Sequence, residues 1–250
     1  MSKRRSLFLS AFGLALFFIA WEILARTGLN SGVLLPPPSS LPKALMSEIR
    51  AGYWLDMIGR SLSHYAVGLT IGTVLGIAFG IATALSLPTE ALLAWVVRML
   101  RPIPSIAWIP FTIIWFGVTE AAAAFLIAIT VFWLNFYATF AAVRAVDKDL
   151  LEMGAAFGQS GLSARMLKII FPAASPGILG GVRAGIGQGW MSVVAAELFG
   201  IPGVGMRMME ASGLLATPIV LLYMVTIAGL YGLTDFLFIR MQNRLLAWQR

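Results

Sequence analysis

The sequence predicts an all-α, polytopic membrane protein with six transmembrane helices. Of its 250 residues, 59 % are hydrophobic and only 12 % are charged, which is about half the roughly 25 % charged share of soluble domains. The apolar residues also gather in runs close to the length, about 20 residues, at which a helix crosses a bilayer core about 30 Å thick. This composition excludes a disordered chain and disfavours a soluble enzyme.

The charge balance is basic without indicating a nucleic-acid partner. Lys and Arg number 18 against 11 Asp and Glu, a net charge of +7, but the basic residues of a membrane protein mainly flank its spans. The chain has no cysteine and one histidine, His64. Disulfides, thiolate chemistry and Cys-based zinc sites are therefore excluded, and no metal site is expected.

The first expected span, residues 7–24, follows three basic residues. A signal peptide would share this pattern, but no small-residue cleavage site follows, so an uncleaved span is favoured. The third run, 103–118, contains Pro104 and Pro110. Its short length requires that it borrow residues from 92–100 or sit short among its neighbours. The other four expected spans are 61–87, 121–143, 178–199 and 219–239.

Six spans place both termini on one side of the membrane, and the basic residues indicate which side. With the N-terminus inside, 13 of the 18 basic residues fall on inner segments and 5 on outer segments. The positive-inside rule therefore predicts that both termini are cytoplasmic. The five outer residues are Arg26, Lys43, Arg50, Arg60 and Arg207.

The chain divides into three expected parts. Residues 1–56 hold the first span and an outer loop, 57–241 form the membrane core, and 242–250 form a cytoplasmic tail. In the loop, three consecutive prolines from Pro36 to Pro38 enforce an extended backbone. Residues 43–58 are compatible with a helix that lies along the outer surface.

Glycines recur every four residues in two of the spans, which places each set on one helix face. Such faces let another helix approach closely. A second reading, that the smooth faces let helices slide during gating, is not separated from tight packing by spacing alone. The two sets are Gly68, Gly72, Gly76 and Gly80, and Gly181, Gly185 and Gly189.

A few polar and aromatic side chains inside the spans are candidates for a solute path or gate, because polar groups at membrane depth are costly. For the acidic one, Glu197, a structural hydrogen bond and a pathway role are both open. The tryptophans also suit aromatic belts or core packing. His64 is expected to satisfy a polar contact at the membrane interface. The candidates are Glu197, Gln188, Trp190, Trp133 and Asn135.

The inner loop 144–176 is too patterned to be a simple connector. Asp147 or Asp149 is placed to cap a helix over 149–157, which a break at 158–161 would end. Ser163 would cap a second short helix that runs to residue 171, and a proline would end it. The pattern predicts a rigid knob that docks into another protein.

This loop resembles the hallmark of the permease subunits of binding-protein-dependent ABC importers. Their hallmark is a Glu-Ala-Ala triplet with a glycine six residues after its glutamate, and a later Leu-Pro. Glu152 and Gly158 keep that spacing, whereas the triplet reads Glu-Met-Gly and the later pair reads Phe171-Pro172. The segments 101–117 and 195–197 resemble the nitrate, sulfonate and taurine branch, and the likeness covers about residues 57 to 241.

The resemblance implies a type I ABC importer transmembrane fold that pairs as a homodimer. Its implied partners are two cytoplasmic ATPase subunits, a periplasmic or extracellular solute-binding protein, and the lipids of the bacterial inner (plasma) membrane. ATP and Mg are expected on the ATPases, since this chain lacks the phosphate-binding Gly-rich loop; it would be no enzyme and bind no cofactor. The implied coupling residues are Glu152, Met153, Gly154, Ala155, Ala156, Phe157, Gly158, Gly161, Leu162, Ser163, Arg165, Met166 and Pro172.

The family likeness favours a small anion such as a sulfonate, taurine or nitrate as the solute. A neutral vitamin or pyrimidine precursor is the alternative substrate class. The rival function is a secondary transporter driven by an ion gradient, which would typically show internal repeats and buried charged residues. The sequence shows no convincing repeat, and its few buried charges lie near the ends of the spans.

Overall fold

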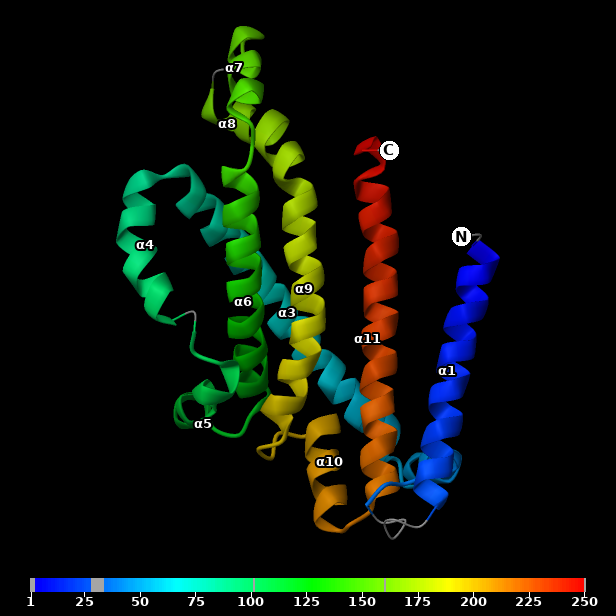
Figure 1. The fold of residues 1–250 in the computed structure, drawn as a ribbon. Helices are drawn as coiled ribbons and strands as arrows, with labels where there is room; N and C mark the ends of the chain where they lie inside the picture. The colour runs from blue at the N-terminus through cyan, green and yellow to red at the C-terminus, as the bar shows by residue number, and fades with distance from the viewer. Residues whose placement is uncertain (1–2, 28–33, 101, 160, 250) are drawn as a thin grey trace.

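The computed structural model describes residues 3–27, 34–100, 102–159 and 161–249, and every regular element in those ranges is a helix. Three long helices form the centre: α3 (Tyr53–Leu85), α6 (Glu120–Arg144) and α9 (Phe171–Glu197). Two further long helices, α11 (Thr217–Leu245) and α1 (Lys3–Arg26), stand beside them (Figure 1). The expected all-α fold is confirmed.

Four of the described helical stretches are long and apolar enough to cross a membrane: α3, α6, the continuous stretch Ser163–Glu197, and α11. α4 (Leu87–Leu100) and the stretch Ser105–Phe116 meet at 91°, and together they would make a fifth candidate if the bent pair counts as one span. α1 has 24 residues and is not among these candidates. The count of six spans therefore stays a prediction.

The run 103–118 is expected either to borrow residues from 92–100 or to sit short among its neighbours, and the structure adds that the two stretches do not form one straight helix. A short 3₁₀ turn, η2 (Ser105–Trp108), leads instead into α5 (Ile109–Phe116). Pro104 precedes η2 with an extended backbone, φ −65° and ψ 146°. Proline has no N–H to donate, and this extended backbone is not helical. The helix therefore does not continue through Pro104.

The outer segment also differs from the prediction of a single helix over 43–58. α2 (Leu41–Arg50) ends two residues before Gly52, whose φ of +77° is left-handed. α3 then begins at Tyr53, eight residues before the expected start of the span. Met57, in the N-terminal part of α3, is buried against Val204 and Tyr223. This contact stabilises the longer helix, and it could not be predicted from sequence periodicity.

The glycine face of α3 lies directly against α6. A Cβ added at Gly68, Gly72, Gly76 or Gly80 would approach atoms of α6 to between 2.5 and 2.8 Å, closer than van der Waals contact allows. On α9, a Cβ at Gly185 would lie 3.0 Å from the Asn135 amide nitrogen, and one at Gly189 would lie 3.0 Å from the ring of Tyr65. A Cβ at Gly181 would meet the side chain of Ala138 on α6. The α3 set therefore brings two helix backbones together, and the α9 set makes room for side chains of α3 and α6.

The two ends of the bundle differ in what they carry. At one end, called here the α7 end, α7 (Lys148–Ala156) and α8 (Leu162–Arg165) protrude beyond the long helices (Figure 1). The first residues of α1 and the last of α11 lie toward the same end. At the opposite end, the α10 end, α10 (Val204–Gly213) packs against α9 and α11.

Candidate functional site

The protruding loop begins with a capped helix. The Asp147 carboxylate accepts a hydrogen bond from the Asp149 N–H at 3.0 Å, so Asp147 is the cap of α7, which starts at Lys148. α7 ends in two backbone bonds: Gly158 N–H to Ala155 O at 3.0 Å, and Gln159 N–H to Gly154 O at 2.8 Å. These are the two bonds of a Schellman motif, which places Gly158 at its left-handed position.

The conformation of Gly158 fits that role. Its φ is +78°, a region that L-residues with side chains adopt only under strain, and nothing lies within 4 Å of the position a Cβ would take. Glycine is therefore required here by the backbone and not by crowding within the chain. Gly154 has the opposite requirement, since a Cβ there would collide with the Ile169 side chain.

The second half of the loop corrects two expectations. Ser163 lies within α8 and does not cap it. Pro172 does not end the element, because α8 continues through η3 (Met166–Ile170), a π-helical turn, into α9. Within η3 the Phe171 N–H bonds the Met166 carbonyl five residues back. Since Pro172 has no N–H to give, a wider turn absorbs the break in the hydrogen-bond pattern.

The expected coupling residues share the α7 end but differ in exposure. Gly154, Arg165 and Met166 are half-buried, whereas Glu152, Ala155, Ala156, Phe157, Gly161 and Ser163 are exposed; the side chain of Leu162 lies outside the described residues. Among the described residues of the knob, four large apolar side chains are exposed, Phe157 the most at 78 %. We call them the knob patch: Leu150, Met153, Phe157 and Leu167.

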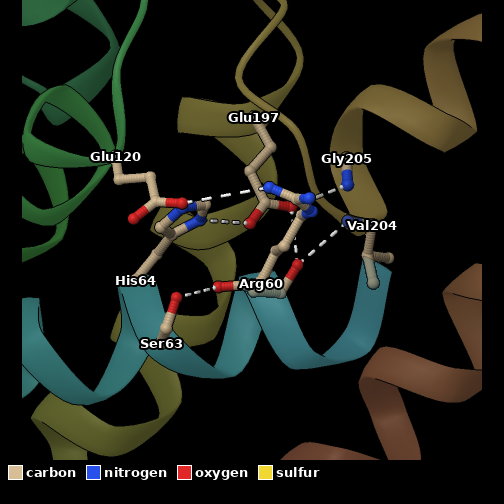
Figure 2. Close-up of polar contacts among 8 residues, drawn as sticks. Arg60, Ser63, His64, Glu120, Glu197, Val204 and Gly205 are labelled. Carbon is tan, nitrogen blue, oxygen red and sulfur yellow. Dashed lines mark hydrogen bonds and ion pairs between the residues drawn. The ribbon is translucent and has the colours of Figure 1, made fainter. Parts of the chain in front are cut away.

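At the α10 end, a buried carboxylate joins three helices (Figure 2). Glu197, at the end of α9, is fully buried, and its Oε2 accepts hydrogen bonds from the Ser61 hydroxyl at 2.9 Å and the Gly205 N–H at 2.8 Å. Nδ1 of His64 lies 3.0 Å from Oε1. The Ser61 oxygen in turn accepts from the Val204 N–H at 2.9 Å.

This carboxylate centre orders the start of α10. Two backbone N–H groups in the first turn of α10 are satisfied by Glu197, one directly and one through Ser61, which is how a helix N-terminus is stabilised by an acidic group. His64 is only 2 % exposed, and the polar contact expected of it is made with Glu197 inside the protein. Its Nε2 is buried without a hydrogen-bond partner among the described residues.

Trp133 and Gln188 line a common cavity of about 270 Å³ between η2, α6 and α9. Ser105, Trp108 and Thr130 contribute to its wall. The cavity joins aromatic surface to a few hydrogen-bonding groups, which is the usual composition of a small-molecule site. We call it the η2 cavity.

The other two path candidates are buried in helix packing, and Trp190 also lines a separate cavity of about 460 Å³ between α9 and α11. The Trp190 ring stacks on Tyr65 with centroids 4.3 Å apart, and its indole N–H donates to Thr234 at 3.1 Å. Asn135 is fully buried and donates to the Val131 carbonyl at 2.9 Å. The five candidates thus divide among the η2 cavity, the carboxylate centre and the helix-packing core.

A second polar cluster escaped sequence reasoning. Arg207 of α10 donates to both carboxylate oxygens of Glu48 of α2, at 3.0 and 2.8 Å, and Tyr223 of α11 donates to Glu48 at 2.8 Å. The hydrogen bonds from Arg207 lower the pKa of the Glu48 carboxyl, and Glu48 raises the pKa of Arg207. The three residues come from separate helices, so no local pattern could have revealed them.

Comparison with known proteins decides the family. Residues 72–249 match the family of binding-protein-dependent transport system inner membrane components. The chain belongs to this family. The permease is 31 % identical to the putative aliphatic sulfonates transport permease protein SsuC of Bacillus subtilis, over 94 % of this chain and 85 % of that protein.

Two other relatives have similar identity. The taurine transport system permease protein TauC of Escherichia coli is 30 % identical, over 98 % of this chain and 90 % of that protein. The bicarbonate transport system permease protein CmpB of Synechococcus elongatus is 31 % identical, over 80 % of this chain and 75 % of that protein. The resemblance to the ABC importer permeases is therefore confirmed.

Solved structures share the fold. An inward-facing structure of the MetNI methionine ABC transporter has a TM-score of 0.66 at 19 % identity, over 78 % of this chain and 96 % of that chain. A structure of an amino acid ABC transporter with histidines has a TM-score of 0.62 at 17 % identity, over 80 % of this chain and 96 % of that one. The permease is thus a membrane subunit of an ATP-driven importer, and this identification is supported over a carrier driven by an ion gradient.

Proposed function

We propose that two copies of the permease form the membrane channel of an importer for a small organic anion of the sulfonate or taurine class. The relatives support this solute class, because their names specify aliphatic sulfonates and taurine, and a third specifies bicarbonate, also an anion. The hydrogen-bonding groups and indole rings of the η2 cavity suit a compact solute with a polar head and an apolar body.

The observation that carries the coupling role is the knob at the α7 end. Exposed apolar side chains on a short, capped helix mark an interaction surface, and the Schellman motif at Gly158 fixes the angle at which α7 meets the rest of the loop. Because α8 runs through η3 into α9 as one stretch, Ser163–Glu197, a push on the knob moves the wall of the η2 cavity that holds Gln188. We assign ATP hydrolysis to two partner subunits that bind this knob.

The coupling proposal is tested by a charge placed on the knob patch. Phe157→Asp should abolish co-purification of the ATPase with the permease, because an unpaired charge would be buried in the contact. Leu214, 77 % exposed at the α10 end, offers the matched control Leu214→Asp, which should retain the ATPase. Normal association of the Phe157 variant would show that the knob is not the docking element.

The solute class needs the complete importer. The permease, its ATPase and its binding protein, reconstituted in liposomes, should take up radiolabelled taurine or an alkanesulfonate when ATP is enclosed on the ATPase side. Nitrate and bicarbonate test the inorganic anions, and a pyrimidine precursor tests the neutral alternative. Uptake of the neutral solute alone would contradict the proposed class.

A further inference from the structure

A second cavity, of about 280 Å³, lies between α4 and α6 nearer the α7 end. It is lined by charged, aromatic and aliphatic side chains, among them Thr83, Glu90, Val97, Arg98, Phe136 and Phe140. We call it the α4 cavity. Because it lies between the η2 cavity and the α7 end, a solute that moves from the η2 cavity toward the α7 end could enter it.

One face of α6 connects the two cavities. Trp133 lines the η2 cavity, and Tyr137 and Phe140, four and seven residues later, line the α4 cavity. Residues at this spacing lie on one helix face. The rings of Trp133 and Tyr137 have centroids 6.4 Å apart. A solute that leaves the η2 cavity toward the α7 end therefore meets a continuous aromatic surface that leads into the α4 cavity.

The two charged residues that line the α4 cavity, Glu90 and Arg98, differ in whether they form an ion pair. Glu90 is already neutralised by an ion pair with Arg144 of α6, which also lies over the Phe140 ring at 5.3 Å. No carboxylate of the described residues pairs with Arg98, whose guanidinium lies 5.4 Å from the Trp95 ring centroid. Among the described residues, Arg98 is thus the one positive charge in the cavity wall without a carboxylate partner, and an arginine with free donors can bind an anion.

A hydroxyl in the wall also lacks a partner. Thr83 is only 4 % exposed, and its Oγ1 makes no hydrogen bond among the described residues. A buried hydroxyl without a partner costs free energy, and a ligand oxygen would remove that cost. Within the part of the chain that the structure describes, the cavity therefore combines a cation, an apolar wall and a wall hydroxyl without a hydrogen-bond partner.

We propose that the α4 cavity is a second binding station for the transported organic anion, on the side from which it is released, with Arg98 holding the anionic head and Phe136 and Phe140 the apolar body. The inference rests on the proposed function, because it assumes that the solute is an organic anion. An anionic lipid headgroup shares this chemistry, and the experiment separates the two sources.

The test is equilibrium binding of radiolabelled benzenesulfonate to the permease–ATPase complex in nanodiscs of neutral phosphatidylcholine. Loss of a charged hydrogen bond weakens binding about tenfold or more, so Arg98→Gln should do so, and Thr83→Val should weaken binding less. Arg98→Lys should retain much of the affinity because it keeps the charge. The uncharged analogue benzenesulfonamide should bind weakly and should not respond to Arg98→Gln.

Arg240→Gln is the matched control, since Arg240 is a basic residue of α11 that lies over the Phe236 ring at 4.4 Å, away from the cavity. Equal affinities in wild type and Arg98→Gln, or equal losses in the Arg98 and Arg240 variants, would overturn the proposal. If Arg98-dependent binding is found for phosphatidylglycerol but not for benzenesulfonate, the cavity is a lipid site and the solute station is also overturned.

Uptake by the complete importer tests the proposed solute class independently of the proposed binding station in the α4 cavity. If liposomes take up neither taurine nor an alkanesulfonate, the proposed solute class is wrong. If they do, and benzenesulfonate binding does not depend on Arg98, the solute class stands and only the α4 station is lost.

Discussion

His64 and Glu197 meet across 133 residues of sequence, with His64 Nδ1 3.0 Å from Oε1 of the carboxylate. One residue belongs to α3 and the other to the end of α9. The same carboxylate bonds the Gly205 N–H of α10, so this contact fixes three helices relative to one another. Gly203 fits beside it because a side chain there would collide with the carboxylate.

The first prediction concerns this carboxylate. Glu197→Ala should destabilise the permease by about 3 kcal/mol or more, because it leaves several buried polar groups without a partner. Glu197→Gln should cost much less, since the amide oxygen can still accept from Gly205 and Ser61 while its NH₂ faces His64. Thermal unfolding in detergent measures both. Glu120, an exposed residue whose carboxylate lies 3.9 Å from Arg60, provides the control Glu120→Gln, expected within about 0.5 kcal/mol of wild type.

The second prediction concerns helix packing. Gly72→Ala should separate α3 from α6 and lower the unfolding temperature, because the new Cβ would lie 2.5 Å from the Ala128 carbonyl oxygen. Gly59 is in the same helix with nothing within 4 Å of its Cβ position. Gly59→Ala should therefore be neutral or stabilising by up to about 1 kcal/mol, through helix propensity alone. A Gly72 variant as stable as the Gly59 variant would contradict the packing role.

The third prediction concerns the Schellman glycine. Gly158→Ala should weaken ATPase stimulation by the loaded binding protein, since a left-handed residue with a Cβ costs about 1–2 kcal/mol and favours another loop conformation. Gly158→Asp, which adds a charge beside the knob patch, should lose ATPase association as well. Gly213, at the α10 end, has no left-handed φ and open space around it, so Gly213→Ala should behave as wild type. Equal stimulation in all three variants would show that the loop angle does not matter.

The fourth prediction concerns pH. Arg207 lowers the pKa of Glu48 below its ordinary value of 4.5 in the folded protein. A lowered carboxyl pKa contributes stability that is present above the ordinary value and is lost as pH falls through the folded value. Glu48→Gln should therefore destabilise the permease at pH 7, by about 1–3 kcal/mol, and the difference should shrink below pH 4.5.

Glu210 supplies the comparison for Glu48, because it pairs with the same Arg207 at 3.0 Å but is exposed. Glu210→Gln should change stability by no more than about 0.5 kcal/mol at any pH. If the Glu48 and Glu210 variants lose the same stability, burial of the Glu48 carboxylate is not the reason that its ion pair with Arg207 stabilises the protein.

The fifth prediction concerns orientation, with both termini and the knob in the cytoplasm. The chain has no native cysteine, so single cysteines can be labelled with an impermeant reagent on intact cells. Exposed sites suit this test: Phe157→Cys and Trp248→Cys should be protected, and Leu214→Cys and Met46→Cys should react. Labelling of position 157 from outside would remove the knob from reach of any cytoplasmic ATPase.

The sequence was most informative where the physics is local. A long apolar run can only be helix in a bilayer, since every backbone polar group must be satisfied within the segment, and the glycine spacing of four directly marked the face of α3 that meets α6. The six-residue spacing located Gly158, and the structure shows that its positive φ is what requires glycine there. Pro172 misled because a proline near a helix start is compatible with continuation, here through the π turn η3.

Other features depended on contacts that only the folded chain makes. Glu197 was recognised as a costly buried group, but its partners come from α3 and α10, and the pairing of Glu48 with Arg207 spans 159 residues. Likewise, no sequence pattern could show that Trp133 lines the η2 cavity whereas the ring of Trp190 stacks on Tyr65. The sequence alone determined the membrane fold, the packing faces and the position of the protruding loop, because periodicity and backbone geometry act over a few residues. Tertiary structure alone decided which polar groups meet and which face a cavity, because those outcomes depend on how distant helices cross.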